Sequence, residues 1–231
     1  MLVGVDVGGT FTDAVLVASG AVHSAKTPTT PGDQSQGVMA AIEVVLERAG
    51  ASPEAVELLA PGMTVATNAL LDGRGARTAF VATEGFTDLV ELGRQARRDL
   101  YRLCAAWPAP FAPPERRFGA RERIGPASVL RPLEGADELA EQVAASGAES
   151  VAVCLLHAYR DPVHERALGV ALRARLGPGV HVSLSHEVVG TFREYERAAT
   201  TEVDAALSPL LAGYLRRLLQ RCDERSASAC R

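Results

Sequence analysis

The first seventeen residues, MLVGVDVGGTFTDAVLV, constrain the fold most, because two valine-rich runs are interrupted by a pair of glycines. Alternating apolar residues over 2–7 and 11–18 predict two strands, and Gly8-Gly9 provides the backbone freedom of a tight turn between them. A third strand over 21–26 would complete a meander. A plain hairpin needs none of the Asp and Thr side chains beside this turn, so a binding role is the alternative.

The polar residues around the glycines suit phosphate and metal binding. Gly8 and Gly9 let backbone N–H groups approach an anion closely, and the hydroxyls of Thr10 and Thr12 add donors. The carboxylate of Asp6 would repel a bare phosphate, so it fits only with a divalent cation between the two. The stretch therefore predicts a cradle for a magnesium-bound phosphate. Its spacing matches neither G-x-G-x-x-G nor G-x-x-x-x-G-K-[ST].

The next segments predict a helix, a strand and then a boundary. Apolar residues at helical spacing over 34–49 end at Gly50, and a short helix with a Gly-rich turn leads to a strand over 78–83. The stretch WPAPFAPP excludes regular structure because proline fixes φ and removes a donor. We expect an irregular connection over 107–134 that follows an N-terminal lobe of residues 1–106.

The second half of the chain predicts an α/β subdomain over 135–192 and a helical segment with a polar tail over 193–231. Helices and strands alternate before the last segment, which favours parallel pairing. The expected elements are a helix over 136–146, a strand over 150–156, a helix over 162–175 and a strand over 180–185. Asp161-Pro162 is a good helix start, and Ser208-Pro209 is expected to split or kink the last helix.

Composition narrows the class of protein. Apolar residues make up 47% of the chain and charged residues 23%, as in an ordinary globular protein. The net charge of −4 is not the excess of positive charge that is typical of nucleic-acid-binding proteins. No apolar stretch is long enough to span a bilayer and no basic leader precedes the first strand, so we expect a cytoplasmic protein without a membrane partner. The four cysteines are too scattered to indicate a zinc site or a disulfide framework.

Two other groups of residues are weaker candidates for chemistry. Ligand types for a metal occur together at His157, Asp161, His164 and Glu165. Their spacing fits no familiar zinc pattern, and Asp161 is better explained as a helix cap. Ser185 and His186 are adjacent on an expected strand, so their side chains should point to opposite faces, which argues against a serine hydrolase.

The opening motif resembles those of known ATP-binding families. GVDVGGTFTD is similar to the first phosphate motif of actin-like ATPases and sugar kinases, and more closely to the D-x-G-G-T-F-T-D start of the hydantoinase A and 5-oxoprolinase family. The resemblance covers the chain from Val3 to about Leu218. It continues through KTPTTP, GMTVATNALLDGRGARTAFVATEGFTDLVELGRQAR, RERI, ESVAVCLLHAYRDPVHE and LSHEVVGTFREYERAATTEVDAAL.

This resemblance implies an α/β fold. It would have the RNase H-like lobe of actin-like ATPases, a second α/β subdomain and C-terminal helices. Relatives clamp the nucleotide with a second Gly-rich lobe. After Thr201 this chain has one glycine, Gly213, so we expect that lobe to be absent.

The resemblance also implies an activity: ATP-dependent opening of a cyclic amide or imide such as 5-oxoproline or a hydantoin, by phosphorylation of its carbonyl oxygen. The implied cofactors are ATP and magnesium, and the implied partner is a hydantoinase B-type subunit or the missing C-terminal lobe. One alternative is an acetone or acetophenone carboxylase subunit, which activates a ketone. Another is a non-catalytic lobe for nucleotide binding or assembly.

Site roles carried over from the family fall into three groups. The resemblance implies catalytic roles for Asp6, which would also organise magnesium through water, and for Thr64, Asn68 and Arg197. It implies cofactor contacts by Gly8, Gly9, Thr10, Thr12 and Asp13. It implies substrate contacts by Arg94, Arg97, Thr200 and Thr201. Thr67 would lie with Thr64 and Asn68 near the reacting end, and Arg98 would join Arg94 and Arg97 in holding a substrate carboxylate or a phosphate.

Structural alternatives stay open for several of these residues. Thr64 and Asn68 would also suit an ordinary helix start, the arginines an exposed basic helix face, and Arg197 a helix-packing role. Pro61 and Asp204 depart from the His and Asn that many family members have at these positions. The lost histidine puts the substrate in doubt.

Overall fold

The structure is a computed structural model that describes residues 1–18, 20–30, 32–96, 101–102 and 108–229, with side chains up to 224. It divides into two compact units: an N-terminal unit of Met1–Asp72 with Leu210–Arg231, and a central unit of Gly73–Pro209. This division differs from the boundaries expected at 106 and 134. The reason is that the end of the last helix packs into the core of the N-terminal sheet.

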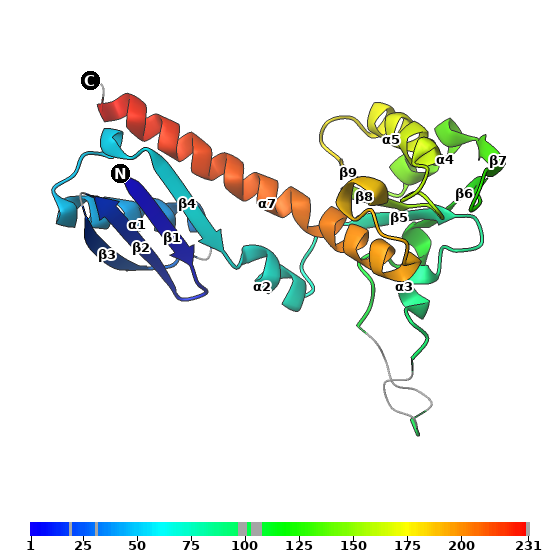
Figure 1. Ribbon diagram of the computed structural model, residues 1–231, viewed down its shortest axis with the longest axis horizontal. Helices are drawn as coiled ribbons and strands as arrows, with labels where there is room; N and C mark the ends of the chain where they lie inside the picture. Colours follow the sequence, from blue (N-terminus) through cyan, green and yellow to red (C-terminus); the bar gives the residue numbers. More distant parts are fainter. Residues whose placement is uncertain (19, 31, 97–100, 103–107, 230–231) are drawn as a thin grey trace. The chain divides into compact units, whose positions relative to one another are not determined.

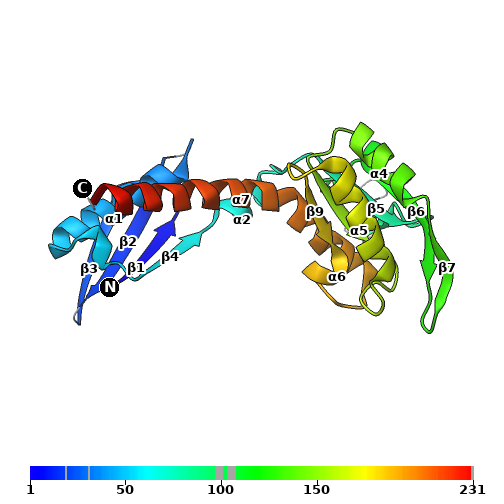
Figure 2. The same ribbon diagram turned by 90° about the horizontal axis from the view of Figure 1, so that it is seen from above.

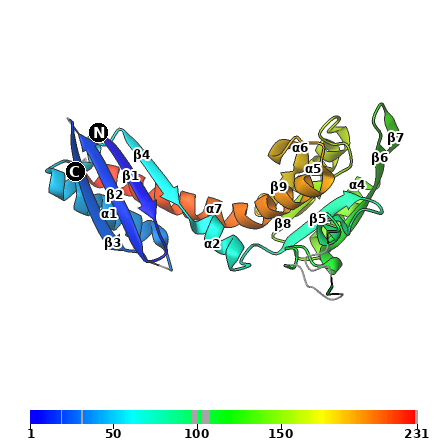
Figure 3. The same cartoon turned by 60° about the horizontal axis from the view of Figure 1, so that its bottom comes forward.

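The N-terminal unit is built on a mixed sheet with the order β3-β2-β1-β4 (Figure 3). The three expected strands are confirmed as the antiparallel meander β1 (Leu2–Val7), β2 (Phe11–Ala18) and β3 (Ala21–Pro28). Strand β4 (Leu58–Met63) pairs parallel to β1. The sequence did not predict this strand, because proline and glycine at 61 and 62 are unfavourable in a strand. An edge strand tolerates a proline, since one of its sides makes no ladder hydrogen bonds.

Helix α1 (Gln34–Ala49) covers one face of this sheet, and its expected bounds are confirmed. Asp33 caps its start by accepting a hydrogen bond from the Ser35 N–H at 3.2 Å, and Gly50 ends it in the left-handed conformation at φ 60°. The core under α1 also contains Tyr214 and Leu218 of the last helix. The short helices η1 (Pro53–Ala55) and α2 (Val65–Leu71) precede and follow β4.

The central unit is a three-layer α/β/α sandwich (Figure 1). Its sheet has the order β7-β6-β5-β8-β9, and the parallel pairing predicted for the strands over 150–156 and 180–185 is confirmed for β8 (Ser150–Cys154) and β9 (His181–Leu184). Strand β5 (Thr78–Thr83), which was expected in the N-terminal lobe, belongs to this sheet and pairs parallel to β8. Helices α4 (Ala136–Ala145) and α5 (Val163–Leu176) pack on one face. The other face packs on α3 (Leu89–Leu92) and the start of the last helix.

The irregular connection expected over 107–134 is wrong. Its second part contains the turn η2 (Pro114–Arg116) and two strands, β6 (Arg117–Ile124), parallel to β5, and β7 (Val129–Glu134), antiparallel to β6. Strand β6 was missed because one of its buried positions is Glu122, which conceals the alternation of apolar residues.

The last helix, α7, runs as one element from Glu194 to Ala229 with Pro209 inside it (Figure 2). The expected split at Ser208-Pro209 is therefore wrong. Both sides of the proline are held by buried contacts, through Ala205 in one core and Tyr214 in the other, and this packing offsets the lost backbone hydrogen bond. No helix in the described part of the chain combines the length and apolar composition needed to cross a membrane.

Candidate functional site

The β1–β2 turn presents free backbone donors. The Gly8 N–H donates to the Phe11 carbonyl at 3.0 Å and closes the turn. Gly9 and Thr10 are exposed, and within the described residues their N–H groups have no protein acceptor. A Cβ atom at Gly8 would lie 3.0 Å from the Phe11 oxygen, so this close turn favours glycine. Two adjacent N–H groups that face solvent can bind an anion.

Thr12 stabilises this turn indirectly, through the side chain of Thr29. The Thr29 hydroxyl donates to the Gly8 carbonyl at 3.0 Å, and its oxygen lies 3.1 Å from the Thr12 hydroxyl oxygen. Because Thr29 has one hydroxyl hydrogen, Thr12 must be the donor between the two. Thr12 is completely buried, so the structure favours a positioning role over direct contact with a phosphate. Thr29 lies in the motif KTPTTP, but sequence reasoning gave it no role.

Two carboxylates face each other beside the turn. Asp6 and Asp13 are direct partners in the antiparallel β1–β2 register, so both side chains lie on the same face of the sheet. Asp13 pairs with Lys26 at 2.8 Å, whereas Asp6 is exposed and makes no ion pair with a described residue. Like charges directly opposite each other destabilise a strand pair unless a cation lies close by.

The space beside Asp6 is kept open by a glycine. Gly62 of β4 is the neighbour of Asp6 on its other side, and a Cβ atom there would lie 3.4 Å from Asp6 Oδ1. Carboxylate oxygens are the ligands that magnesium prefers. The donor set and the room around Asp6 therefore fit a hydrated magnesium ion.

Thr64 and Asn68 lie at the same edge of the sheet as Asp6 and the turn. Strands β1 and β4 are parallel, so their carboxyl ends coincide, and the Thr64 hydroxyl donates to the Val7 carbonyl at 3.1 Å. The Asn68 amide nitrogen lies 3.4 Å from the Thr64 oxygen. Thr64 makes no side-chain capping hydrogen bond to α2, so ordinary capping does not explain its orientation. The carboxyl edge of parallel strands is a common place for ligand sites.

Arg197 lies in the central unit and is completely buried. Its guanidinium donates to the Ser185 hydroxyl at 3.1 Å, to the Thr191 carbonyl at 2.8 Å and to the Leu155 carbonyl at 2.8 Å. Each of its three nitrogens is thus occupied by a protein acceptor. This arrangement suits a residue that positions the loops after β8 and β9.

The expectation that Ser185 and His186 lie on a strand is wrong. Strand β9 ends at Leu184, and the short helix α6 (Ser185–Val188) follows it, so the two side chains do not alternate across a strand. Both bind the buried carboxylate of Glu165, the Ser185 hydroxyl at 2.6 Å and His186 Nδ1 at 2.7 Å. A serine hydrolase is still not supported, because the serine donates to Glu165 and not to the histidine.

A second buried carboxylate belongs to Glu122, which the sequence patterns did not identify. It accepts a hydrogen bond from the Thr83 hydroxyl and lies 2.7 Å from His164 Nδ1. His164 and Glu165 therefore belong to separate carboxylate clusters rather than to one metal site. Asp161 accepts a hydrogen bond from the Val163 N–H at 3.1 Å. The helix begins at Val163 and its N-cap residue is Pro162, so the expected Asp161 cap with a first-turn proline is displaced by one residue.

The neighbouring thiol is not a ready nucleophile. Cys154 ends β8, and burial raises the pKa of its thiol to about 11. At neutral pH it is therefore protonated.

The other expected substrate contacts also lie in the central unit. Arg94 pairs with Glu196 at 2.8 Å and lines a cavity of about 410 Å³ together with Tyr195. The hydroxyls of Thr200 and Thr201 each donate to the carbonyl four residues earlier in α7, at 2.7 Å. Arg97 and Arg98 lie outside the described residues.

Comparison with known proteins decides the family. The model of the hydantoinase/oxoprolinase N-terminal region matches residues 2–176. The chain belongs to this family. The acetophenone carboxylase gamma subunit of Aromatoleum aromaticum is 36% identical over an alignment of 222 residues that covers 88% of this chain and 30% of that protein. Caprolactamase subunit alpha of Pseudomonas jessenii is 33% identical over an alignment of 230 residues that covers 93% of this chain and 32% of that protein.

Solved structures of hydantoinase/oxoprolinase relatives confirm the fold. A nucleotide-free acetone carboxylase structure and the ATP-dependent caprolactamase of P. jessenii each align with a TM-score of 0.85, at 25% and 30% sequence identity. Each alignment covers 97% of this chain and 34% of the solved chain. The expected α/β fold with an actin-like N-terminal lobe is thus confirmed, and the chain spans about a third of the length of these relatives.

Proposed function

We propose that the N-terminal unit binds the phosphates of ATP at the β1–β2 turn, as part of an ATP-dependent enzyme that opens a cyclic amide or imide. One observation carries this proposal. Asp6, the turn from Gly8 to Thr10 and the Thr64 hydroxyl meet at a single edge of the sheet, and the Thr64 bond to Val7 ties the two strand ends together.

Each residue then has a defined role. The exposed N–H groups of Gly9 and Thr10 hold phosphate oxygens, while Thr12 keeps the turn in shape through Thr29. Asp6 orients the waters of a magnesium ion, and Lys26 neutralises Asp13 beside it. Magnesium-bound ATP, when present, would supply a phosphoryl group to the amide carbonyl oxygen and leave as ADP, which makes the carbonyl carbon more reactive. Attack by water, cleavage of the ring C–N bond and hydrolysis of the phosphorylated carboxyl group by a second water would then give the open amino acid and phosphate. Thr64 and Asn68 lie where they can orient that carbonyl.

The names of the relatives support a proposal for the substrate and the partner. One is named a caprolactamase subunit and is ATP-dependent, and the matched family model is named for hydantoinase and oxoprolinase. We therefore propose a cyclic amide as the substrate. Because the chain spans about a third of these relatives, the complete reaction also needs a C-terminal lobe or a hydantoinase B-type subunit.

A carboxylase subunit is the second candidate function. The identity of 36% with an acetophenone carboxylase gamma subunit is slightly higher than the 33% identity with the caprolactamase subunit. In that case the phosphorylated oxygen belongs to the enol of a ketone. ATP turnover stimulated by a ketone with bicarbonate, and not by 5-oxoproline, hydantoin or caprolactam, would favour this candidate.

The test is calorimetric titration of the chain with ATP, with and without magnesium. We expect Asp6→Asn to weaken binding of magnesium-bound ATP about tenfold or more. Binding of metal-free ATP should stay equal or become tighter, because the wild-type carboxylate repels a phosphate that has no metal ion. Asp88→Asn removes an equal, exposed charge in the central unit and serves as the control. The proposal fails if the wild type does not bind magnesium-bound ATP or if the two variants behave alike.

A further inference from the structure

The peptide between Gly8 and Gly9 decides what the β1–β2 turn presents to a phosphate. Neither glycine lies in the left-handed region, and a Cβ atom on Gly9 would have no neighbour within 4 Å. The folded turn therefore does not itself require glycine at position 9. A peptide between two glycines can rotate at little steric cost, because glycine also accepts positive φ. Such a rotation would exchange the directions of the Gly8 carbonyl and the Gly9 N–H.

The two ends of this peptide have opposite effects on an anion. In a planar trans peptide the C=O and N–H groups point in opposite directions. The Gly9 N–H can therefore bind a phosphate oxygen only while the Gly8 carbonyl points away from it. If the peptide rotated, the partial negative charge of the carbonyl oxygen would face the phosphate and repel it. Phosphate affinity thus depends on whatever group holds the Gly8 carbonyl.

Thr29 is the group that holds it. A β-turn is commonly closed by a hydrogen bond from its fourth N–H to its first carbonyl. Within residues 8–11, the Phe11 N–H makes no such bond, and the Gly8 carbonyl accepts from the Thr29 hydroxyl at 3.0 Å. The Thr29 N–H also donates to the Thr10 carbonyl at 2.9 Å. One residue thus holds the carbonyls on both sides of the Gly9 N–H.

The Thr29 hydroxyl is itself fixed by a buried contact with the segment under α1. Its oxygen lies 3.1 Å from the hydroxyl oxygen of Thr12, which is completely buried. The neighbouring Thr30 hydroxyl accepts from the Gly37 N–H of α1 at 3.0 Å. A Cβ atom on Gly37 would lie 3.2 Å from Thr30 Oγ1 and 3.4 Å from Thr12 Oγ1. Helix α1 therefore packs directly against both hydroxyls and leaves them little room to turn.

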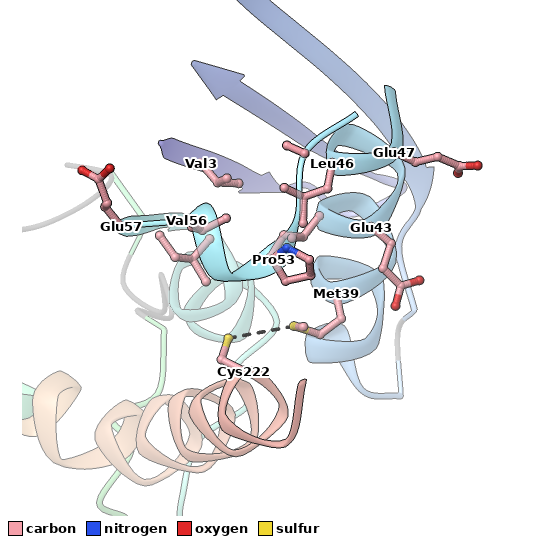
Figure 4. A pocket seen from close by; sticks show the side chains of 12 residues that line it. Val3, Met39, Glu43, Leu46, Glu47, Pro53, Val56, Glu57 and Cys222 are labelled. Atoms are coloured by element: carbon pink, nitrogen blue, oxygen red, sulfur yellow. Dashed lines mark hydrogen bonds between the residues drawn. The ribbon is translucent and has the colours of Figure 1, made fainter. Parts of the chain in front are cut away.

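Helix α1 is held in turn by α7. Arg221 donates to the Ser35 hydroxyl at 2.9 Å and pairs with Asp33 at 2.8 Å. Further along both helices, the Cys222 thiol lies 4.0 Å from the Met39 sulfur, and a dashed line marks this contact in Figure 4. The turn is therefore supported by a network of contacts that includes both helices of the N-terminal unit.

We propose that Thr29 is a positioning residue of the phosphate site. Its hydroxyl prevents rotation of the Gly8–Gly9 peptide and so keeps the Gly9 N–H directed at the phosphate. This inference rests on the proposed binding of magnesium-bound ATP at the turn. Thr29 does not touch the phosphate and acts through the Gly8 carbonyl.

Two substitutions separate the Thr29 hydroxyl from the backbone contact of the same residue. Thr29→Val keeps the size of the side chain and the bond from its N–H to Thr10, whereas Thr29→Ser keeps the hydroxyl. In calorimetric titrations of the full chain with magnesium-bound ATP, Thr29→Val should bind at least about fivefold more weakly than the wild type. Thr29→Ser should stay within about twofold of the wild type, because the hydrogen bond to Gly8 is retained.

Thr27→Val is the matched control. Thr27 is also half-buried, and its hydroxyl contacts the Gly37 carbonyl of α1 at 3.4 Å and not the turn. This variant should bind magnesium-bound ATP as tightly as the wild type. Thermal unfolding of each variant sets a titration temperature at which all of them are folded.

The amide resonance of Gly9 reports on the peptide without ATP. In a chain labelled with ¹⁵N-glycine, this resonance is assigned by its absence from the spectrum of Gly9→Ala. It should shift in Thr29→Val and stay close to its wild-type position in Thr29→Ser and Thr27→Val. A hydroxyl that only stabilised the fold would lower the melting temperature and change neither the affinity nor this resonance.

Three results would overturn this inference and leave the proposed function standing. They are a Thr29→Val variant that binds magnesium-bound ATP as tightly as the wild type, a Thr29→Ser variant that loses as much affinity as Thr29→Val, and a Thr27→Val variant that matches Thr29→Val. A wild type that does not bind magnesium-bound ATP overturns the proposed function and the role of Thr29 together.

Discussion

At the residue scale, the structure separates side chains that can meet a ligand from side chains that hold others in place. Asp6 and Thr10 are exposed, whereas Thr12 and Arg197 are completely buried with protein partners. Family resemblance alone assigns all four to the site. Burial and hydrogen bonding indicate that the second pair acts through its neighbours.

Arg197→Met should destabilise the central unit strongly. The change removes three hydrogen bonds and leaves the Ser185 hydroxyl oxygen and the Thr191 and Leu155 carbonyls without this donor, which costs about 1–3 kcal/mol for each buried group left unpaired. Arg94→Met breaks an exposed ion pair and should cost about 0–1 kcal/mol. Urea unfolding followed by circular dichroism measures both. Equal midpoints for the two variants would rule out the positioning role.

Glu202 offers a test of a buried carboxylate. It accepts a hydrogen bond from the Ala112 N–H at 2.7 Å, and burial raises its pKa. Glu202→Gln keeps an acceptor and removes the buried charge, so stability at pH 7 should be unchanged or higher. Glu202→Leu leaves the Ala112 N–H unpaired and should cost about 1–3 kcal/mol. Urea unfolding that shows the opposite order would contradict this account.

At the element scale, an ion pair joins the start of α1 to α7. Asp33 caps α1, and it also pairs with Arg221 at 2.8 Å. The hydrogen bond from Ser35, followed by the contact with Arg221, holds the pKa of the Asp33 carboxyl below its ordinary value. The end of α1 depends instead on Gly50, whose φ of 60° suits glycine. Both ends of the helix are therefore set by single residues.

Acid should remove the contribution of Asp33. A carboxyl whose pKa is lower in the folded state stabilises that state above its ordinary pKa, and this contribution is lost as the pH falls through the folded value. At pH 7, Asp33→Asn should therefore cost about 1 kcal/mol, and the difference from the wild type should shrink below about pH 4. Thermal unfolding across this range tests it, with Asp88→Asn as a control without a capping bond. A constant difference would be contrary to this explanation.

Gly50→Ala should destabilise α1. A Cβ atom at positive φ is strained, and we expect a loss of about 1 kcal/mol. Gly179→Ala is the matched control, because Gly179 has open space around it and no positive φ. If chemical denaturation gives both variants the same stability, the left-handed end of the helix is not what fixes its length.

At the scale of the whole molecule, the two sheets differ in how many of their faces are covered by helices. The central sheet is covered on both faces. On the N-terminal sheet, α1 and α7 pack on the face that carries Val3 and Val5, whereas residues of alternate positions are exposed on the other. These exposed apolar residues are Leu2, Val15, Val17, Val22 and Leu58. A patch of this kind promotes association.

The chain should therefore self-associate with rising concentration. Val17 and Val22 are 43% and 68% exposed on this face, so Val17→Thr with Val22→Thr should weaken association. Val163 and Val170 of α5 are 47% and 68% exposed, and their double replacement by threonine is the control. Sedimentation velocity measures both. A wild type that stays monomeric at all concentrations would contradict this prediction.

Much of the fold could be predicted from local patterns. Strands β1 and β2 follow from the alternation of side chains, β5 from a short apolar run between turns, and helix α1 from helical spacing that ends at Gly50. These signals depend on neighbours in the sequence. Strands β4 and β6 could not be predicted. Pro61 is tolerated only because β4 is an edge strand, and Glu122 is buried only because Thr83 and His164 satisfy it.

The sequence by itself determined the turn chemistry of Asp6, Gly8 and Gly9, because a tight turn and its donors are local. The tertiary structure alone decided which distant residues join that turn. Parallel pairing of β1 with β4 brings Thr64 to Val7, and burial gives Arg197, a candidate for a catalytic role, protein partners on all three guanidinium nitrogens. Pairing and burial depend on contacts between residues far apart in the chain, and no local pattern encodes them.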